Sequence, residues 1–119
     1  METGTFISNY FEHFKRVAFD NSIEPMLLVL SNLLKSAEAK GNKVIFAGNG
    51  ASATIASHCA LDFTKQAGIR AMSFNDPAIL TAYGNDYGYE QWVAKALEHY
   101  AEPEDLFICV SVSGKSQNI

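Results

Sequence analysis

Residues able to bind an anion or move a proton gather in two segments of this chain. The first begins with the sequence GNGAS at 48–52, which follows the apolar run 44–47 and leads into a helix-like stretch. The second, with the sequence SVSGKS at 111–116, follows the apolar run 106–110. A strand, a turn of small residues and a helix together aim backbone N–H groups and a positive helix end at an anion. Two such turns predict one ligand held from both sides.

The first turn allows three interpretations. It matches the pattern G-x-G-x-x-A, which after a strand is typical of dinucleotide-binding sites, and Asp76 is then a candidate acid for a ribose hydroxyl. A plain tight connection between strand and helix has the same composition. Asn49 and Ser52 add polar side chains that suit a sugar hydroxyl or a phosphate as well as a pyrophosphate.

The second turn favours a phosphate. Ser111, Ser113 and Ser116 offer hydroxyl donors, and Gly114 allows backbone N–H groups to converge on an anion. The Gly-Lys-Ser sequence is similar to the end of a Walker A loop, but that motif needs a glycine where this chain has Cys109. A nucleoside triphosphate loop is therefore not expected. Capping of a following helix is the alternative role for these serines.

His58 and Asp62 are four residues apart in the stretch after the first turn, so they share one face of the expected helix. An imidazole and a carboxylate at this spacing can bind a metal ion or carry out proton transfer. A solvated pair on the helix surface is the alternative. The position just behind an anion-binding turn favours the functional roles.

Asn85 and Asp86 belong to the sequence YGNDYG, which is rich in turn-forming residues. We expect a turn between two helices here. These side chains are then either ligand-binding groups or caps of the helix that follows.

The elements that must position these residues alternate in type after Gly41. Strands are expected at 43–47, 70–74 and 106–110. Helices are expected at 52–66, 77–83 and 88–101. Such alternation predicts a parallel sheet built from right-handed crossovers, whose ligands bind beyond the carboxyl ends of the strands.

Two helices are expected ahead of the first strand. Pro25 suits a first helical turn, and Gly41 is a suitable stop. The first of these helices carries an apolar stripe that a partner subunit could cover. The stripe consists of Phe6, Ile7, Tyr10, Phe11, Phe14, Val17 and Ala18.

Composition narrows the class of protein. With 119 residues, 48% of them hydrophobic and 18% charged, the chain forms at most one domain of ordinary globular character. A net charge of -4 with scattered basic residues argues against nucleic-acid binding. Cys59 and Cys109 lie in apolar segments without metal-site spacing, which predicts buried reduced thiols in a cytoplasmic protein. The N-terminal sequence indicates neither a signal peptide nor a membrane span.

In this order and spacing the motifs GNGAS…SH…DFT, GNDYGYE and SVSGKS resemble the sugar isomerase (SIS) domain, and within it the phosphoheptose isomerase branch. The resemblance covers about 43–119, and the two leading helices also fit it. It implies a three-layer α/β/α fold with a parallel, flavodoxin-like sheet. We expect one domain over 1–119, with a helical pair at 1–41 and the start of the sheet at 42–119. Because the family's chains are longer, a C-terminal part is expected to be missing.

The resemblance also implies an activity: isomerisation of sedoheptulose 7-phosphate to an aldose through an enediol, within a cytoplasmic homotetramer that serves heptose and lipopolysaccharide synthesis. Asp62 is then the catalytic base, and zinc is associated with His58 and Asp62. No nucleotide cofactor is expected. The implied substrate-binding residues are Asn49, Gly50, Ala51, Ser52, Asn85, Asp86, Ser111, Val112, Ser113 and Ser116.

Three residues depart from the family pattern. Asp62 replaces a glutamate, Val112 replaces a threonine, and Ala51 replaces a glycine. The aspartate side chain is one methylene shorter than that of glutamate, and a base held about 1 Å too far from its substrate can lose roughly a hundredfold in rate. The family's remaining glutamine and histidine come from its C-terminal part. A non-catalytic phosphosugar-binding or sensor module therefore stays open beside the isomerase, as does a nucleotide-binding fragment.

Overall fold

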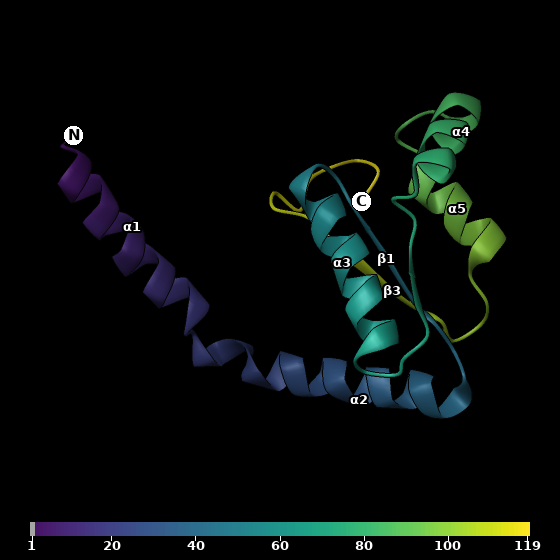
Figure 1. The fold of residues 1–119 in the computed structure, drawn as a ribbon, viewed down its shortest axis with the longest axis horizontal. Helices are drawn as coiled ribbons and strands as arrows, with labels where there is room; N and C mark the ends of the chain where they lie inside the picture. The colour runs from purple at the N-terminus through teal and green to yellow at the C-terminus, as the bar shows by residue number, and fades with distance from the viewer. Residues whose placement is uncertain (1) are drawn as a thin grey trace. The chain divides into compact units, whose positions relative to one another are not determined.

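The computed structural model describes residues 2–119 as two units, one ending at Ser31 and one beginning at Asn32. The first unit contains α1 (Thr3–Ala18), η1 (Asn21–Ile23) and the start of α2 (Glu24–Lys40) (Figure 1). Both helices predicted ahead of the sheet are thus confirmed. Along α1, the Tyr10 ring contacts those of Phe11 and Phe14, with centroids 5.9 and 6.5 Å apart. These apolar rings remain about half exposed.

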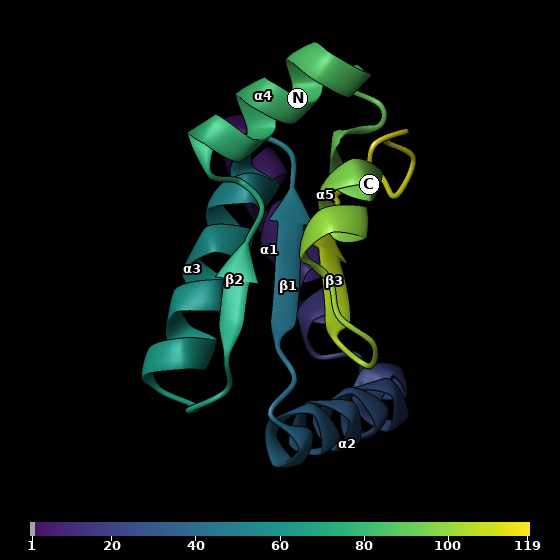
Figure 2. The same cartoon turned by 90° about the vertical axis from the view of Figure 1, so that its right-hand side faces the viewer.

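The second unit is built on three parallel strands in the order β2–β1–β3. They are β1 (Val44–Gly48), β2 (Ala71–Ser73) and β3 (Leu106–Val110), and Figure 2 shows their arrows pointing the same way. The chain passes from β1 to β2 on one side and then returns to β3 on the other. The predicted parallel sheet is confirmed, and its order changes direction between β1 and β3, where ligands bind in such folds.

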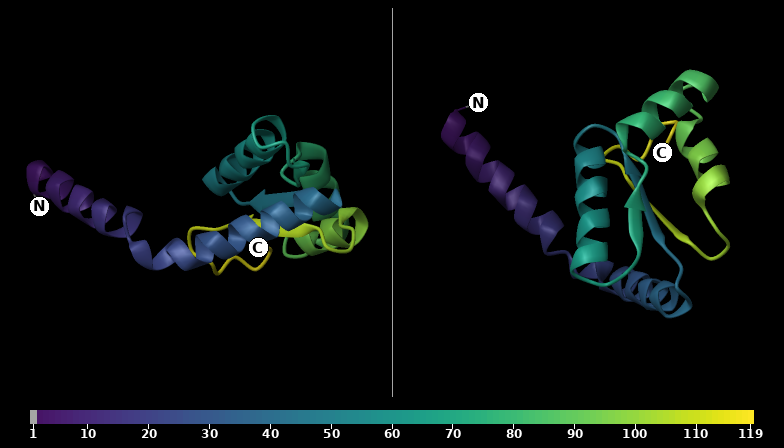
Figure 3. Two further views of the ribbon diagram at one scale, coloured as in Figure 1. Left: turned by 90° about the horizontal axis from the view of Figure 1, so that it is seen from below. Right: turned by 45° about the vertical axis from the view of Figure 1, so that its right-hand side comes forward.

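Helices cover both faces of this sheet. α3 (Ala51–Lys65) packs on the face that carries Val44 and Phe46, while α4 (Pro77–Tyr87) and α5 (Trp92–Tyr100) pack on the face that carries Ile45 and Ala47 (Figure 3). Since neighbouring residues of a strand point to opposite faces, a run of apolar residues in β1 supplies both cores. The three-layer, flavodoxin-like α/β/α fold is confirmed.

The boundary between α4 and α5 differs from the prediction. Asp76 caps α4 by accepting the N–H groups of Ala78 and Ile79, so its carboxylate is occupied by the fold. The helix then continues through Gly84 and ends at Gly88, whose φ of +87° suits a glycine. Asn85 and Asp86 therefore lie in the last turn of α4 and not between helices. The alternative role for these two residues, capping of the next helix, is contradicted, because α5 begins after Gln91 without a side-chain cap.

The cysteines are free, as predicted, but they are not buried. Cys59 is partly exposed and Cys109 is exposed. Cys109 and Phe107 occupy alternate positions of β3, which lies at the edge of the described sheet and exposes every second residue. An apolar run alone could not distinguish this edge strand from the fully buried β1.

Candidate phosphate-binding site

The two polar turns lie side by side. β1 and β3 are hydrogen-bonded neighbours with Gly48 aligned to Val110, so residues 48–52 (the β1–α3 turn) and 111–116 (the serine loop) leave the same edge of the sheet. In Figure 2 both segments lie beyond the arrowheads. A pocket of about 190 Å³ opens between them. Its lining residues are Asn49, Ser52, Val110, Ser111, Val112, Ser113 and Ser116.

The two glycines of the β1–α3 turn are needed for different reasons, close packing at Gly48 and a positive φ at Gly50. A Cβ atom on Gly48 would lie 2.6 Å from the backbone carbon and oxygen of Ser52, so only glycine lets the strand meet the first turn of α3. Gly50, at φ +56°, is the N-cap of α3 and provides no side-chain cap. Ser52 is buried at the pocket wall. The positive end of a 15-residue helix, which has no side-chain cap, therefore lies beside the pocket. The N–H groups of Ser52 and Ala53 bond to the carbonyls of Asn49 and Gly50, so the helix dipole is what this end offers an anion.

Two carboxamides clamp this turn. Asn75, just after β2, accepts the Gly48 N–H through Oδ1 (3.0 Å) and donates from Nδ2 to the Gly48 carbonyl (2.7 Å). Asn118 makes a reciprocal pair with the Asn49 side chain, both bonds being 2.9 Å. Tyr89 donates its hydroxyl to Asn49 Oδ1 at 2.9 Å. Sequence reasoning missed Asn75, Tyr89 and Asn118.

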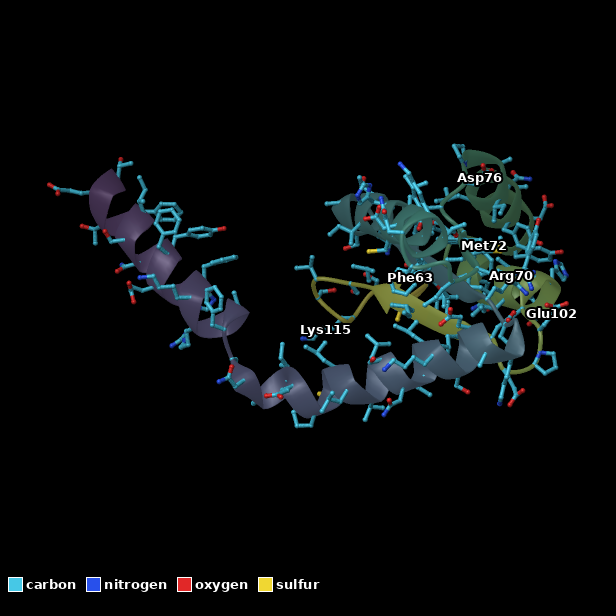
Figure 4. The ribbon with its side chains drawn as sticks, turned by 60° about the horizontal axis from the view of Figure 1, so that its bottom comes forward. Phe63, Arg70, Met72, Asp76, Glu102 and Lys115 are labelled. Atoms are coloured by element: carbon cyan, nitrogen blue, oxygen red, sulfur yellow. The ribbon has the colours of Figure 1, made fainter. Side chains whose placement is uncertain are left out.

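The hydrogen bonds within the serine loop use its hydroxyl oxygens as acceptors and leave the hydroxyl protons available to donate. Ser111 Oγ accepts the Gly114 N–H (3.0 Å), and Ser113 Oγ accepts the Lys115 N–H (3.2 Å). These two amides are therefore occupied within the loop, contrary to the expected nest of free N–H groups. A hydroxyl that accepts one bond can still donate its own proton, so the serines can point donors at an anion. Lys115 is exposed and projects from the loop (Figure 4).

None of the residues lining the pocket is ionisable. Any anion there would be held by hydroxyl, amide and helix dipoles, which act at short range. The only pKa value shifted to about 2 among the described groups belongs to Asp105, which precedes β3 at the opposite end of the sheet.

His58 and Asp62 form a pair on α3, with His58 Nε2 3.2 Å from Asp62 Oδ2. Both side chains are well exposed, at 70% and 49%. Counting from Ser52, the two residues lie about 9 and 15 Å further along the helix axis, and neither lines the pocket. The side of α3 facing the sheet is occupied by apolar groups, including Phe63, labelled in Figure 4, whose ring contacts Phe46 at 5.2 Å.

Asn85 and Asp86 do not line the pocket. The Asn85 amide donates to the Asp86 carboxylate at 3.0 Å, and both residues are exposed at the end of α4. Tyr89, three residues beyond Asp86, is the residue of this region that reaches the β1–α3 turn. The GNDYGYE motif is thus connected to the site through its tyrosine.

A match over almost the whole chain decides the family. Residues 9–119 match the family model described as SIS domain. The chain belongs to the SIS domain family. The polar pocket at the switch point between β1 and β3 is thus part of a SIS domain.

Curated relatives of this SIS domain include phosphoheptose isomerases. It is 36% identical over 115 residues to the phosphoheptose isomerase of Akkermansia muciniphila, covering 91% of this chain and 59% of the relative. It is 44% identical over 85 residues to phosphoheptose isomerase 2 of Campylobacter jejuni, covering 66% and 42%. The chain thus spans about half the length of these relatives.

Solved structures agree with the sequence matches. A phosphoheptose isomerase from Francisella tularensis superposes with a TM-score of 0.87 at 29% identity, covering 99% of this chain and 65% of that one. A second, from Neisseria gonorrhoeae, gives 0.84 at 26% identity, covering 98% and 65%. The resemblance to phosphoheptose isomerases is confirmed.

The donors on α3 fit only part of a zinc site. Zinc in proteins takes three or four protein ligands, and His58 and Asp62 supply two. Within residues 2–119 there is no group of three or more histidine, cysteine, aspartate or glutamate side chains that could hold a metal ion.

Residues 2–119 include no helix long and apolar enough to cross a bilayer.

Proposed function

We propose that this SIS domain binds a phosphorylated sugar and, within its whole protein, isomerises sedoheptulose 7-phosphate to the corresponding aldose. The observation that carries the proposal is the junction of the two turns, which forms one pocket lined by serines beside an uncapped helix end. The similarity to phosphoheptose isomerases supports the choice of substrate.

The proposed site binds the phosphate group of the sugar. Ser111, Ser113 and Ser116 donate hydroxyl protons to the phosphate oxygens, while the first turn of α3 supplies a favourable dipole. The pocket holds no competing carboxylate among its lining residues. Binding energy from this remote group can then orient the reacting carbons, as expected for a catalyst that uses distant contacts.

Proton transfer is assigned to Asp62. The phosphate of the substrate is on carbon 7 and the carbonyl on carbon 2, so the reacting carbons lie at the far end of the sugar from the pocket. Asp62 carries the only carboxylate on α3, the helix that begins at the pocket. Its carboxylate takes a proton from carbon 1 while the carbonyl oxygen on carbon 2 gains a proton from solvent, which gives the enediol. A proton then returns to carbon 2, and the hydroxyl on carbon 1 loses its proton to solvent to leave the aldehyde.

The pairing of His58 and Asp62 has a second role in the proposal. Zinc would be held by these two residues together with ligands from outside residues 2–119. Without those ligands the described residues give an incomplete set, so no step of the reaction is assigned to a metal. Dialysis against zinc followed by metal analysis tests this point, and a His58→Ala variant that retains equal zinc would contradict it.

Assembly and location complete the proposal. We propose a homotetramer, the assembly that the family resemblance implies, and the half-exposed rings of α1 (Phe6, Tyr10, Phe11 and Phe14) offer an apolar surface for contacts between subunits. A cytoplasmic location is consistent with two free cysteines. Light scattering on the purified protein measures the molar mass of the assembly. The mass of a monomer at micromolar concentration would contradict the homotetramer.

The activity is tested by NMR with sedoheptulose 7-phosphate in deuterated water. The expected result is a growing aldose signal with solvent deuterium at carbon 2. Asp62→Asn should reduce the rate at least about a hundredfold, since general base catalysis contributes that much. Asp62→Glu restores the family's longer side chain and is the matched control, expected to retain activity. No aldose and no exchange with the unaltered protein would reject the isomerase.

A phosphosugar-binding module without turnover is the second candidate. The shorter acid at Asp62 favours it, as does Val112, which is 98% exposed and lacks the family's hydroxyl. Binding of sedoheptulose 7-phosphate by calorimetry, with no exchange at carbon 2, would select this module over the enzyme.

A further inference from the structure

The side chain of Asn49 is almost fully occupied by protein partners. Its Oδ1 accepts two hydrogen bonds, from Asn118 Nδ2 and from the Tyr89 hydroxyl, each 2.9 Å long. Its Nδ2 donates one bond to Asn118 Oδ1, also 2.9 Å long. A carbonyl oxygen has two lone pairs and an amide nitrogen two protons, so a single N–H remains for any ligand. Asn49 is therefore held in place as part of the pocket wall.

Asn118 ties the end of the serine loop to this wall. It is 8% exposed, and both ends of its carboxamide bond to Asn49. The next residue, Ile119, donates its N–H to the Ser116 carbonyl (3.2 Å) and packs against the core cluster that contains Trp92. Ser116 is thereby fixed through its neighbours on both the polar and the apolar side.

Tyr89 brings in a third segment. It lies in the connection between α4 and α5, and its ring packs near Trp92 with centroids 6.5 Å apart. Three segments distant in sequence thus meet at one carboxamide: the β1–α3 turn, the α4–α5 connection and the end of the serine loop.

We propose that Asn118 and Tyr89 are positioning residues that lock Asn49 and hold the serine loop against the β1–α3 turn, so that the anion pocket is formed before an anion binds. The serine loop has no regular secondary structure, and its other hydrogen bonds among the described residues are local ones between residues two or three apart. A loop that must order on binding loses affinity, whereas a loop held in its bound shape does not. That the anion is a sugar phosphate rests on the proposed function, but the first test needs no ligand.

The first test measures amide hydrogen exchange in the full chain without ligand. In Asn118→Ala, exchange at Gly114, Lys115 and Ile119 should become about tenfold faster, since these N–H groups close the serine loop. Tyr89→Phe keeps the ring and removes one hydroxyl bond, so a smaller increase is expected at the same amides. It also provides a readout if Asn118→Ala does not fold.

The matched control is Asn42→Ala. Asn42 also donates its amide across the fold, to the Pro103 carbonyl at 2.9 Å, but at the opposite end of the sheet. Exchange at the three serine-loop amides should be unchanged in this variant. Equal exchange in Asn118→Ala and Asn42→Ala would overturn the proposal.

The second test measures binding of sedoheptulose 7-phosphate and of inorganic phosphate by calorimetry. Asn118→Ala should weaken both about tenfold, and Tyr89→Phe less. The double variant should lose less than the product of the single losses, because both residues act through Asn49. Faster exchange with unchanged affinity would overturn the positioning role. If the unaltered chain binds neither ligand, the proposed function fails, while the exchange result still decides whether the loop is held by Asn118.

Discussion

The two ends of the β1–β3 pair use polar residues in opposite ways. At the amino end, Lys43 Nζ lies 2.6 Å from Asp105 Oδ2, with side chains 14% and 2% exposed. Asp105 also accepts the backbone N–H groups of Lys43 and Glu102. At the carboxyl end, neutral hydroxyls surround an open pocket in which no lining residue is charged.

The difference means that charge and a perturbed pKa do not mark the binding site proposed for this chain. A second pocket, of about 270 Å³, lies at the amino end, but there Lys40 pairs with Glu104 at 2.6 Å and Asp105 is satisfied by Lys43. Charged groups that already pair with one another have few hydrogen-bonding sites left for a ligand. The serine hydroxyls keep their protons available, so the neutral end is the one suited to bind an anion.

The largest expected effect is on the amino end. Asp105→Ala removes the buried partner of the Lys43 ammonium and leaves it only the exposed carboxylate of Glu102, which should lower the free energy of unfolding by about 3–5 kcal/mol. The folded fraction should still bind sedoheptulose 7-phosphate with unchanged affinity. Urea unfolding and calorimetry measure the two quantities. Glu102→Ala is the control: Glu102 is 70% exposed, so removing its ion pair with Lys43 should cost less than about 1 kcal/mol. A large loss of affinity in Asp105→Ala would break the separation between the ends.

At the carboxyl end the strongest change is Gly48→Ala. The added Cβ would meet the Ser52 backbone at 2.6 Å, which should cost about 1–3 kcal/mol of stability and abolish sugar-phosphate binding. Gly84→Ala is the matched control, because nothing lies within 4 Å of its Cβ position and alanine favours the helix. Thermal unfolding and calorimetry on both variants test the prediction. Unchanged binding in Gly48→Ala would contradict the close approach.

Acid should affect the amino end before it affects the pocket. Burial opposes ionisation of Asp105, but bonds from the Lys43 ammonium and from two backbone N–H groups hold its pKa at about 2, below its ordinary value of 3.8. Because the pKa is lower in the folded state, Asp105 stabilises the fold fully above about pH 4, and this contribution is lost as the pH falls toward 2. The loss is on the order of 2 kcal/mol. Urea unfolding at several pH values should show it, and Asp105→Asn should remove this part of the pH dependence.

The smallest expected effect belongs to a single hydroxyl. Ser111→Ala removes one donor and the acceptor of the Gly114 N–H, which should weaken phosphate binding about tenfold, or about 1.4 kcal/mol. Global stability should change by less than that, since the loop is partly exposed. Calorimetry with inorganic phosphate makes the measurement. Ser57→Ala is the control, because it removes an exposed hydroxyl of α3 that bonds to Ser73 of β2, and this variant should bind phosphate normally.

The sequence was sufficient for the elements and for the meeting of the two turns. Apolar runs followed by glycine and serine predicted β1, β3 and their polar ends, and adjacency of parallel strands then joined those ends. It was not sufficient for the limits of α4, because Gly84 and Asn85 are typical of turns and yet continue a helix capped by Asp76.

The clamping residues were missed for a related reason. Asn75 follows β2 at the same edge of the sheet, a position that could have indicated it, but a single asparagine after a strand is common in turns. Tyr89 and Asn118 act through side-chain pairs 40 and 69 residues from Asn49, which no local pattern encodes. The edge position of β3, which exposes Cys109, depends likewise on the sheet as a whole.

A calorimetric comparison of sedoheptulose 7-phosphate with unphosphorylated sedoheptulose tests the central assignment most directly. If residues 111–116 and the start of α3 bind the phosphate, the phosphorylated sugar should bind at least about a hundredfold more tightly, a difference of about 2.7 kcal/mol. Replacing both Ser111 and Ser113 by alanine should remove most of that difference. Equal affinity for the two sugars, or a preference that survives the double substitution, would contradict the account.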